Sequence, residues 1–137
     1  MPSITGLIET ALYVTDMPHA VDFYQRVLGF ETLRGDERFH AFSVASRHVL
    51  LLFLKGGSLT TQVLPGGTIP PHDGSGPVHI GFTIDASALA EWEQRLANHG
   101  VTIEGRTTWD RGGTSIYFRD PDGHLLELLT PGVWTIY

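Results

Sequence analysis

The chain has 137 residues, a formal net charge of −6 and no cysteine. This length suits one domain with a substantial core, and the lack of cysteine excludes disulfides, thiolate metal sites and cysteine nucleophiles. Lys and Arg form no cluster, which argues against a nucleic-acid partner. The longest apolar run, 49–54, is too short to span a bilayer, and the first residues lack a secretory pattern. We therefore expect a cytoplasmic protein without a membrane partner.

The first half of the chain predicts a β-α-β-β-β module over about residues 5–55. Residues 5–15 alternate between apolar and polar positions, as in a half-buried strand. Asp16-Met17-Pro18 is typical of a helix start, and Gly29 is placed to end that helix. Three further strands are expected, over residues 30–35, 39–45 and 48–55.

Residues 56–77 form a Gly/Pro-rich connection. A structureless connection of this length is usually a linker or a functional lid. His72 lies in it, and an exposed loop histidine is favoured over a residue that reaches the site.

The second half repeats the pattern over about residues 78–130. A strand over 78–85 precedes a helix that Asp85 or Ser87 is expected to cap and Gly100 to end. Further strands are expected near 101–108, 114–119 and 124–130. The last two are joined by Asp120-Pro121-Asp122-Gly123, a strong turn sequence that predicts a β-hairpin.

Aligning the two halves pairs Glu9 with His79 and Leu51 with Glu127. By the two-residue period of a strand, Glu9, His79 and Glu127 all lie on the face opposite the one that carries the helix. Glu127 stands alone in a leucine-rich strand, where a carboxylate is costly unless it is paired, hydrogen-bonded or bound to a metal.

The chain resembles the vicinal oxygen chelate superfamily, which includes glyoxalase I, extradiol dioxygenases, fosfomycin-resistance transferases and bleomycin-resistance proteins. The resemblance rests on Phe23-Tyr24 with Leu28-Gly29-Phe30, on His79-Ile80-Gly81-Phe82 and on residues 115–129. It implies an α+β fold in which two βαβββ modules form a cupped mixed sheet. It also implies a single domain over 1–137 and a homodimer.

In this superfamily the metal ligands occupy the first and last strands of each module. The matching positions here are Glu9, Leu51, His79 and Glu127. Leu51 is not a ligand, and Glu9 departs from the usual His or Gln. The resemblance therefore implies a divalent ion held by at most three side chains. One imidazole and two carboxylates favour Mn²⁺, Fe²⁺, Co²⁺, Ni²⁺ or Mg²⁺ and do not exclude Zn²⁺.

The alternative for these three residues is a hydrogen-bonded polar trio without a metal. Two carboxylates that face one cavity repel each other, whereas a divalent cation neutralises both, so the metal is favoured. Such a site leaves open positions for water and substrate. The resemblance to glyoxalase I implies that one of the carboxylates, Glu9 or Glu127, detaches to serve as the catalytic base.

Aromatic residues and one loop are expected to bind the substrate. The glycines of loop 109–115 let backbone N–H groups face an anion, which Arg111 would also hold. A solvated hairpin loop is an equal alternative, and the aromatic residues suit a core or a dimer interface equally well. The predicted substrate-binding residues are Tyr13, Phe42, Leu51, Phe53, Trp109, Arg111 and Tyr117.

Two functions follow from these features. The first is a metalloenzyme that binds vicinal oxygens of a small substrate for isomerase, lyase or addition chemistry, with ring-cleaving oxygenation disfavoured by the single histidine. The second is a bleomycin-resistance-like protein that binds a drug or metabolite without catalysis. Two residues argue against fosfomycin transfer as the leading reaction. Glu9 replaces the first metal-binding histidine of fosfomycin enzymes, and Ala11 stands where those enzymes carry a hydroxyl residue.

Overall fold

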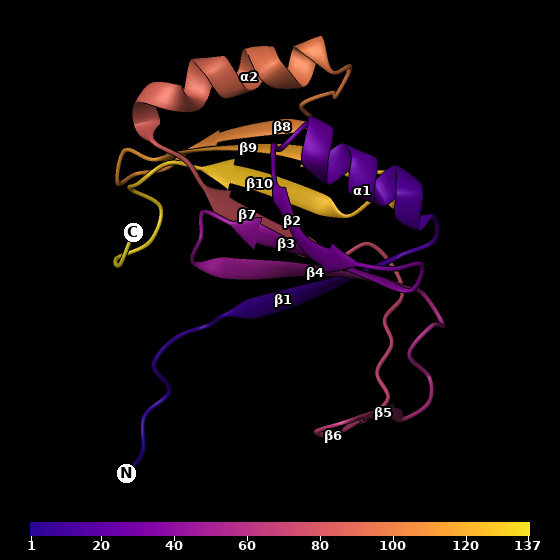
Figure 1. Ribbon diagram of the computed structural model, residues 1–137. Helices are drawn as coiled ribbons and strands as arrows, with labels where there is room; N and C mark the ends of the chain where they lie inside the picture. The colour runs from indigo at the N-terminus through magenta and orange to yellow at the C-terminus, as the bar shows by residue number, and fades with distance from the viewer. The chain divides into compact units, whose positions relative to one another are not determined.

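The computed structural model describes residues 1–137 as two compact units, Met1–Ser75 and Gly76–Tyr137. Each unit contains a four-stranded mixed sheet and one α-helix (Figure 1), so the predicted α+β fold with two βαβββ modules is confirmed. None of the helices has the length and apolar character needed to cross a membrane.

The first unit has the strand order β1-β4-β3-β2. Strands β1 and β4 are parallel, and the other neighbours are antiparallel. The helix starts where predicted, because an Asp16 carboxylate oxygen accepts the His19 N–H at 3.0 Å. Gly29, at φ 74°, follows its end. The elements are β1 (Glu9–Val14), α1 (Met17–Arg26), β2 (Glu31–Gly35), β3 (Phe39–Val44) and β4 (His48–Leu54).

One face of this sheet forms the core with α1. Leu12 and Val14 of β1 and Leu50 and Leu52 of β4 are almost completely buried, as the two-residue period predicts. Phe42 is also fully buried, and its ring lies 5.9 Å from that of Tyr24 in α1. The opposite face of β1 carries Glu9, Ala11 and Tyr13.

The connection 56–77 is more ordered than predicted. It contains a hairpin of β5 (Gln62–Leu64) and β6 (Gly67–Ile69), and the chain then returns to the first unit. His72 donates its backbone N–H to the Ser58 carbonyl at 2.9 Å. Its Nδ1 lies 2.7 Å from the Tyr13 hydroxyl, and its ring makes an edge contact with Phe53. The prediction of an exposed loop histidine is therefore wrong, because these contacts half-bury His72.

The second unit repeats the topology in the order β7-β10-β9-β8. Its helix is not capped by Asp85 or Ser87 as predicted, because a 3₁₀ turn over Ala86–Ala88 precedes it and neither turn nor helix has a side-chain cap. Figure 1 shows this helix over the sheet, and a Glu93–Arg106 ion pair ties it to β8. The elements are β7 (His79–Thr83), α2 (Leu89–Asn98), β8 (Gly105–Thr108), β9 (Thr114–Arg119) and β10 (Leu125–Leu129).

His40 is expected to make the stability of the first unit depend on pH. Burial lowers the pKa of His40 below its ordinary value of 6.5. The folded state therefore binds this proton less tightly than the unfolded state, so stability falls as pH drops below about 6.5. We expect His40→Gln to reduce the loss of stability between about pH 7.5 and pH 5.5 in urea unfolding. The same change at exposed His48 is the control and should leave the pH dependence as it is.

Candidate metal centre

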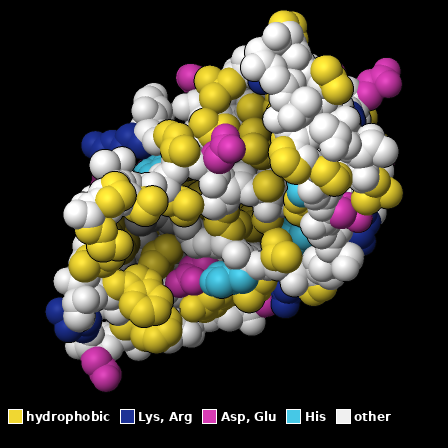
Figure 2. Space-filling model, turned by 90° about the horizontal axis from the view of Figure 1, so that it is seen from below, with side chains coloured by type: hydrophobic (Ala, Val, Ile, Leu, Met, Phe, Trp, Pro, Cys, Tyr) yellow, Lys and Arg dark blue, Asp and Glu magenta, His cyan; other side chains and the backbone are white.

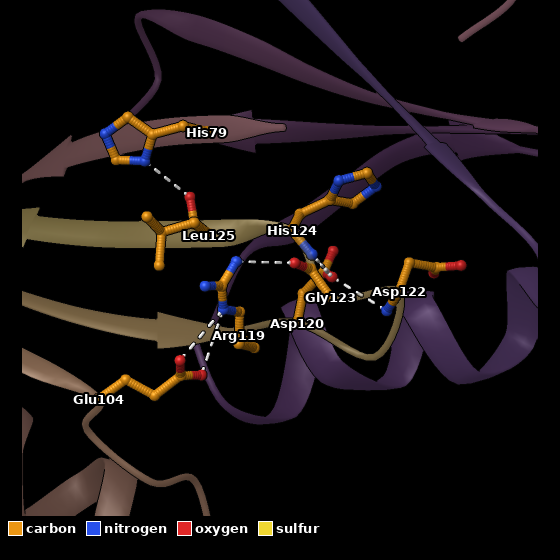
Figure 3. Close-up of polar contacts among 8 residues, drawn as sticks. All are labelled: His79, Glu104, Arg119, Asp120, Asp122, Gly123, His124 and Leu125. Carbon is orange, nitrogen blue, oxygen red and sulfur yellow. Dashed lines mark hydrogen bonds and ion pairs between the residues drawn. The ribbon is translucent and has the colours of Figure 1, made fainter. Parts of the chain in front are cut away.

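The turn that begins β10 is held by its own side chains (Figure 3). A carboxylate oxygen of Asp120 accepts the backbone N–H groups of Asp122 and His124 at 3.0 and 2.9 Å. Arg119 donates to the Gly123 carbonyl at 3.1 Å and also pairs with the Glu104 carboxylate. Gly123 has φ 81°, a conformation that suits glycine. These bonds confirm the predicted hairpin and fix where β10 begins.

Asp120→Ala should loosen this turn. The backbone N–H groups of Asp122 and His124 lose their acceptor, and the hydrogen bond from His124 is buried. We expect a loss of about 1–3 kcal/mol in the free energy of unfolding, measured by chemical denaturation. Asp110→Ala, at an exposed loop position, serves as the control and should change stability by less than about 0.5 kcal/mol. Equal effects of the two changes would contradict this role for Asp120.

The strand register places Glu127 on the same sheet face as His79. Glu127 of β10 lies opposite Gly81 of β7 and opposite Tyr117 of β9, while His79 is opposite Leu125. Gly81 has no side chain, and a Cβ built there would lie 3.7 Å from a Glu127 carboxylate oxygen. That separation is an ordinary van der Waals contact, whereas the same Cβ would lie only 3.1 Å from Leu129 Cδ2. Glu127 itself is 8% exposed.

His79 and Glu127 face each other with a defined imidazole orientation. His79 Nδ1 lies 2.9 Å from the Leu125 carbonyl oxygen, so Nδ1 must carry the proton that is donated (Figure 3). Its Nε2 lies 3.1 Å from Glu127 Oε1. In the neutral imidazole Nε2 then presents a lone pair to the carboxylate, and two lone pairs repel. A shared proton or a metal cation between them removes that repulsion.

The other oxygen of Glu127 is bound to Ser115. The Ser115 hydroxyl donates to Glu127 Oε2 at 2.5 Å and accepts the Trp109 indole N–H at 2.8 Å. Ser115 is completely buried. Ser115 is not among the predicted site residues, although strand alternation puts it on the same face as Tyr117 and therefore beside Glu127.

The predicted ligands are divided between the two units. Glu9 begins β1 of the first unit, is exposed, and lies opposite Val49 in the register with β4. His79 and Glu127 belong to the second unit. Neither unit by itself brings together three His, Asp or Glu side chains suited to one metal ion. The second unit therefore brings together two of the three predicted ligands, and Glu9 remains a predicted third ligand.

The predicted substrate-binding residues occupy three kinds of position. Phe42 lies in the core of the first unit, which was the alternative expected for the aromatic residues. We therefore no longer count Phe42 among the predicted substrate-binding residues. Leu51, Phe53 and Tyr13 are half-buried on the sheet face that carries Glu9. Tyr117 lies opposite Glu127.

The loop residues Trp109 and Arg111 are both exposed. Figure 2 shows a histidine side chain next to an acidic side chain, with hydrophobic side chains beside them. Arg111 remains the predicted anion contact of the loop, and Trp109 is connected to Glu127 through Ser115.

The donor atoms of the second unit fit a divalent ion. Two neighbouring ligands of an octahedral ion, each about 2.1 Å from it, lie about 3.0 Å apart. The observed separation between His79 Nε2 and Glu127 Oε1 is 3.1 Å. The Leu125 carbonyl fixes the imidazole and Ser115 fixes the carboxylate, as the outer partners of metal ligands commonly do.

Each unit is thus a βαβββ module, and the second unit carries a histidine–carboxylate pair. A family model described as "Glyoxalase/Bleomycin resistance protein/Dioxygenase superfamily" matches residues 6–128. The chain belongs to this superfamily, as its resemblance to vicinal oxygen chelate proteins predicted.

The chain is similar to enzymes of known name over most of its length. It is 30% identical to the metallothiol transferase FosB of Bacillus licheniformis, covering 96% of this chain and 79% of the relative. It is 33% identical to FosB of Shouchella clausii, covering 93% and 81%. The crystal structure of a lactoylglutathione lyase from Agrobacterium tumefaciens superposes with a TM-score of 0.87 at 30% identity, covering 98% and 99%.

These relatives confirm the predicted class, a divalent-metal-dependent enzyme, and do not favour the alternative of a binding protein without catalysis. The chain is also 27% identical to the fosfomycin resistance protein FosX of Listeria innocua, covering 91% of this chain and 89% of the relative. Glu9 and Ala11 are the residues that argue against fosfomycin transfer as the leading reaction.

Proposed function

We propose that Glu9, His79 and Glu127 hold one divalent ion that acts as a Lewis acid on a small substrate with neighbouring oxygens. The observation that carries this proposal is the pair of donor atoms, His79 Nε2 and Glu127 Oε1, fixed 3.1 Å apart. The proposal requires both modules to act as a single domain over 1–137, with Glu9 as the third ligand.

The reaction we propose is addition of a thiol to a small substrate, or isomerisation or elimination of a thiol derivative. The names of the relatives support chemistry on thiols and their derivatives, since one is a metallothiol transferase and another a lactoylglutathione lyase. A bound ion would polarise the substrate oxygens and stabilise the negative charge that develops on them.

Within this scheme the two carboxylates have different roles. Glu127 is anchored by Ser115 and is nearly buried, so it serves as a fixed ligand. Glu9 is exposed at the start of its strand, so it is the carboxylate that can leave the ion and accept a proton. Tyr13, Leu51, Phe53, Trp109, Arg111 and Tyr117 are the proposed substrate contacts.

The test combines metal binding with two activity assays. Protein stripped with a chelator is reloaded with Mn²⁺, Co²⁺, Ni²⁺, Fe²⁺, Mg²⁺ or Zn²⁺, and we expect stoichiometric binding with a raised melting temperature. The loaded protein is then assayed with fosfomycin plus a thiol, and separately with lactoylglutathione. Thiol consumption in the first assay supports addition, and turnover in the second supports lyase chemistry. Absence of metal binding would contradict the proposal.

We further propose a cytoplasmic homodimer. The β5–β6 hairpin is the surface we propose for self-association, because it exposes Leu64 and Ile69 on one face and Val63 on the other. Sedimentation equilibrium tests this: a mass near twice 15.1 kDa is expected, and a single monomeric species would contradict it.

A further inference from the structure

We propose that Ser115 and Trp109 are positioning residues for the metal ligand Glu127, an inference that rests on the proposed function. Two successive hydrogen bonds connect them: Trp109 Nε1 to Ser115 Oγ at 2.8 Å, and Ser115 Oγ to Glu127 Oε2 at 2.5 Å. Together they form a relay from the β8–β9 loop to the carboxylate.

The direction of both bonds is fixed by chemistry. An indole N–H can only donate, so the Ser115 oxygen accepts it. The Ser115 hydroxyl proton is then available to Glu127, which accepts it as a carboxylate. Oε2 is thereby occupied, and Oε1 is the oxygen left facing His79. The relay thus determines which carboxylate oxygen is presented to the ion.

The loop that carries Trp109 is held by its backbone. The Trp109 N–H donates to the Gly113 carbonyl at 2.8 Å, and the Gly113 N–H donates to the Gly132 carbonyl at 3.0 Å. A Cβ at Gly113 would lie 2.7 Å from a Gly132 backbone carbon, so this close approach requires glycine. The backbone that carries the Trp109 indole is therefore held in place by these two hydrogen bonds.

The relay also runs from the surface to the interior. Trp109 is 37% exposed, whereas Ser115 is completely buried and Glu127 is 8% exposed. Binding of a cation at Oε1 withdraws negative charge from the carboxylate, which weakens its attraction for the Ser115 proton and alters the indole hydrogen bond. Trp109 emission should therefore change when the ion binds.

The experiment measures metal affinity and Trp109 emission together. In a Trp92→Phe, Trp134→Phe background Trp109 is the sole tryptophan. Zn²⁺ serves as the probe because it is a strong binder and a closed-shell ion without redox chemistry. Affinity is measured by calorimetry, and emission is recorded in the same titration series.

We expect Ser115→Ala to raise the Kd for Zn²⁺ about 10- to 100-fold, the usual effect of losing an outer partner of a ligand. It should also abolish the emission change. Trp109→Phe keeps the Ser115 hydroxyl and should weaken binding less than Ser115→Ala does, by about 10-fold, the lower end of that range. This variant also provides the test if Ser115→Ala fails to fold.

Ser58→Ala is the matched control, since Ser58 is equally buried but bonds to Arg38 in the first unit. It should leave both the Kd and the emission response unchanged. Equal Zn²⁺ affinity in wild type, Ser115→Ala and Trp109→Phe would overturn the relay alone. Failure of the wild type to bind any metal would overturn the proposed function as well, so the two failures are distinguishable.

Discussion

Replacing Glu127 with Gln is expected to abolish stoichiometric metal binding and to lower kcat/KM by more than about 100-fold. Loss of an outer partner alone costs about 10- to 100-fold, and this change removes a charged ligand itself. The amide keeps the size of the side chain and can still accept the Ser115 proton, so the hydrogen bond at 2.5 Å has a replacement. Calorimetric titration with Mn²⁺ or Zn²⁺ and steady-state kinetics are the measurements.

The control for this substitution is Glu104→Gln. Glu104 pairs with Arg119 at the protein surface, where a single ion pair contributes little. We expect Glu104→Gln to bind metal and turn over substrate as the wild type does. If Glu127→Gln retained wild-type metal affinity, the pair with His79 would be a structural contact and the metal centre would lie elsewhere.

Phe42→Ala should destabilise the protein by about 3–5 kcal/mol, the range measured for large aromatic residues truncated in a core. Phe42 is fully buried and its ring packs near those of Tyr24, Phe30 and His40. Because domains are stable by only about 5–15 kcal/mol, this loss is a large fraction of the total. The midpoint of urea unfolding measures it.

Phe53→Ala provides the comparison on the neighbouring strand. Phe53 is half-buried on the opposite sheet face, where it contacts Tyr13, Phe39 and His72. We expect a smaller loss of stability together with an increased KM, because this face is the proposed substrate side. If Phe42→Ala raised KM without a loss of stability, Phe42 would be a substrate-binding residue after all.

Much of the fold was predictable because its signals are local. The alternation of Leu12 and Val14 and the cap at Asp16 specify strands and helices without reference to distant residues. The hairpin β5–β6 was missed although Pro65-Gly66 between two short apolar runs is a turn signal. Its strands have only three residues each, too few for a period to be recognised.

The candidate site was predictable only in part. Pairing the halves identified His79 and Glu127, whose proximity follows from the register of β7 with β10. Ser115 was missed because it bonds to Glu127 diagonally between β9 and β10, and this contact can be recognised only once the register of the two strands is known. His72 was misjudged for a similar reason, since its burial depends on a return of the connection to Tyr13.

Every ladder of the two four-stranded sheets is confined to one unit, β1 to β4 in the first and β7 to β10 in the second. A break in the chain near residues 74–77 would therefore cut no hydrogen bond of either sheet. The gene could be divided there and its halves co-expressed as two polypeptides. The same separation allows the two modules to differ in sequence at matching positions without disturbing each other's ladders: one has Leu51 where the other has Glu127.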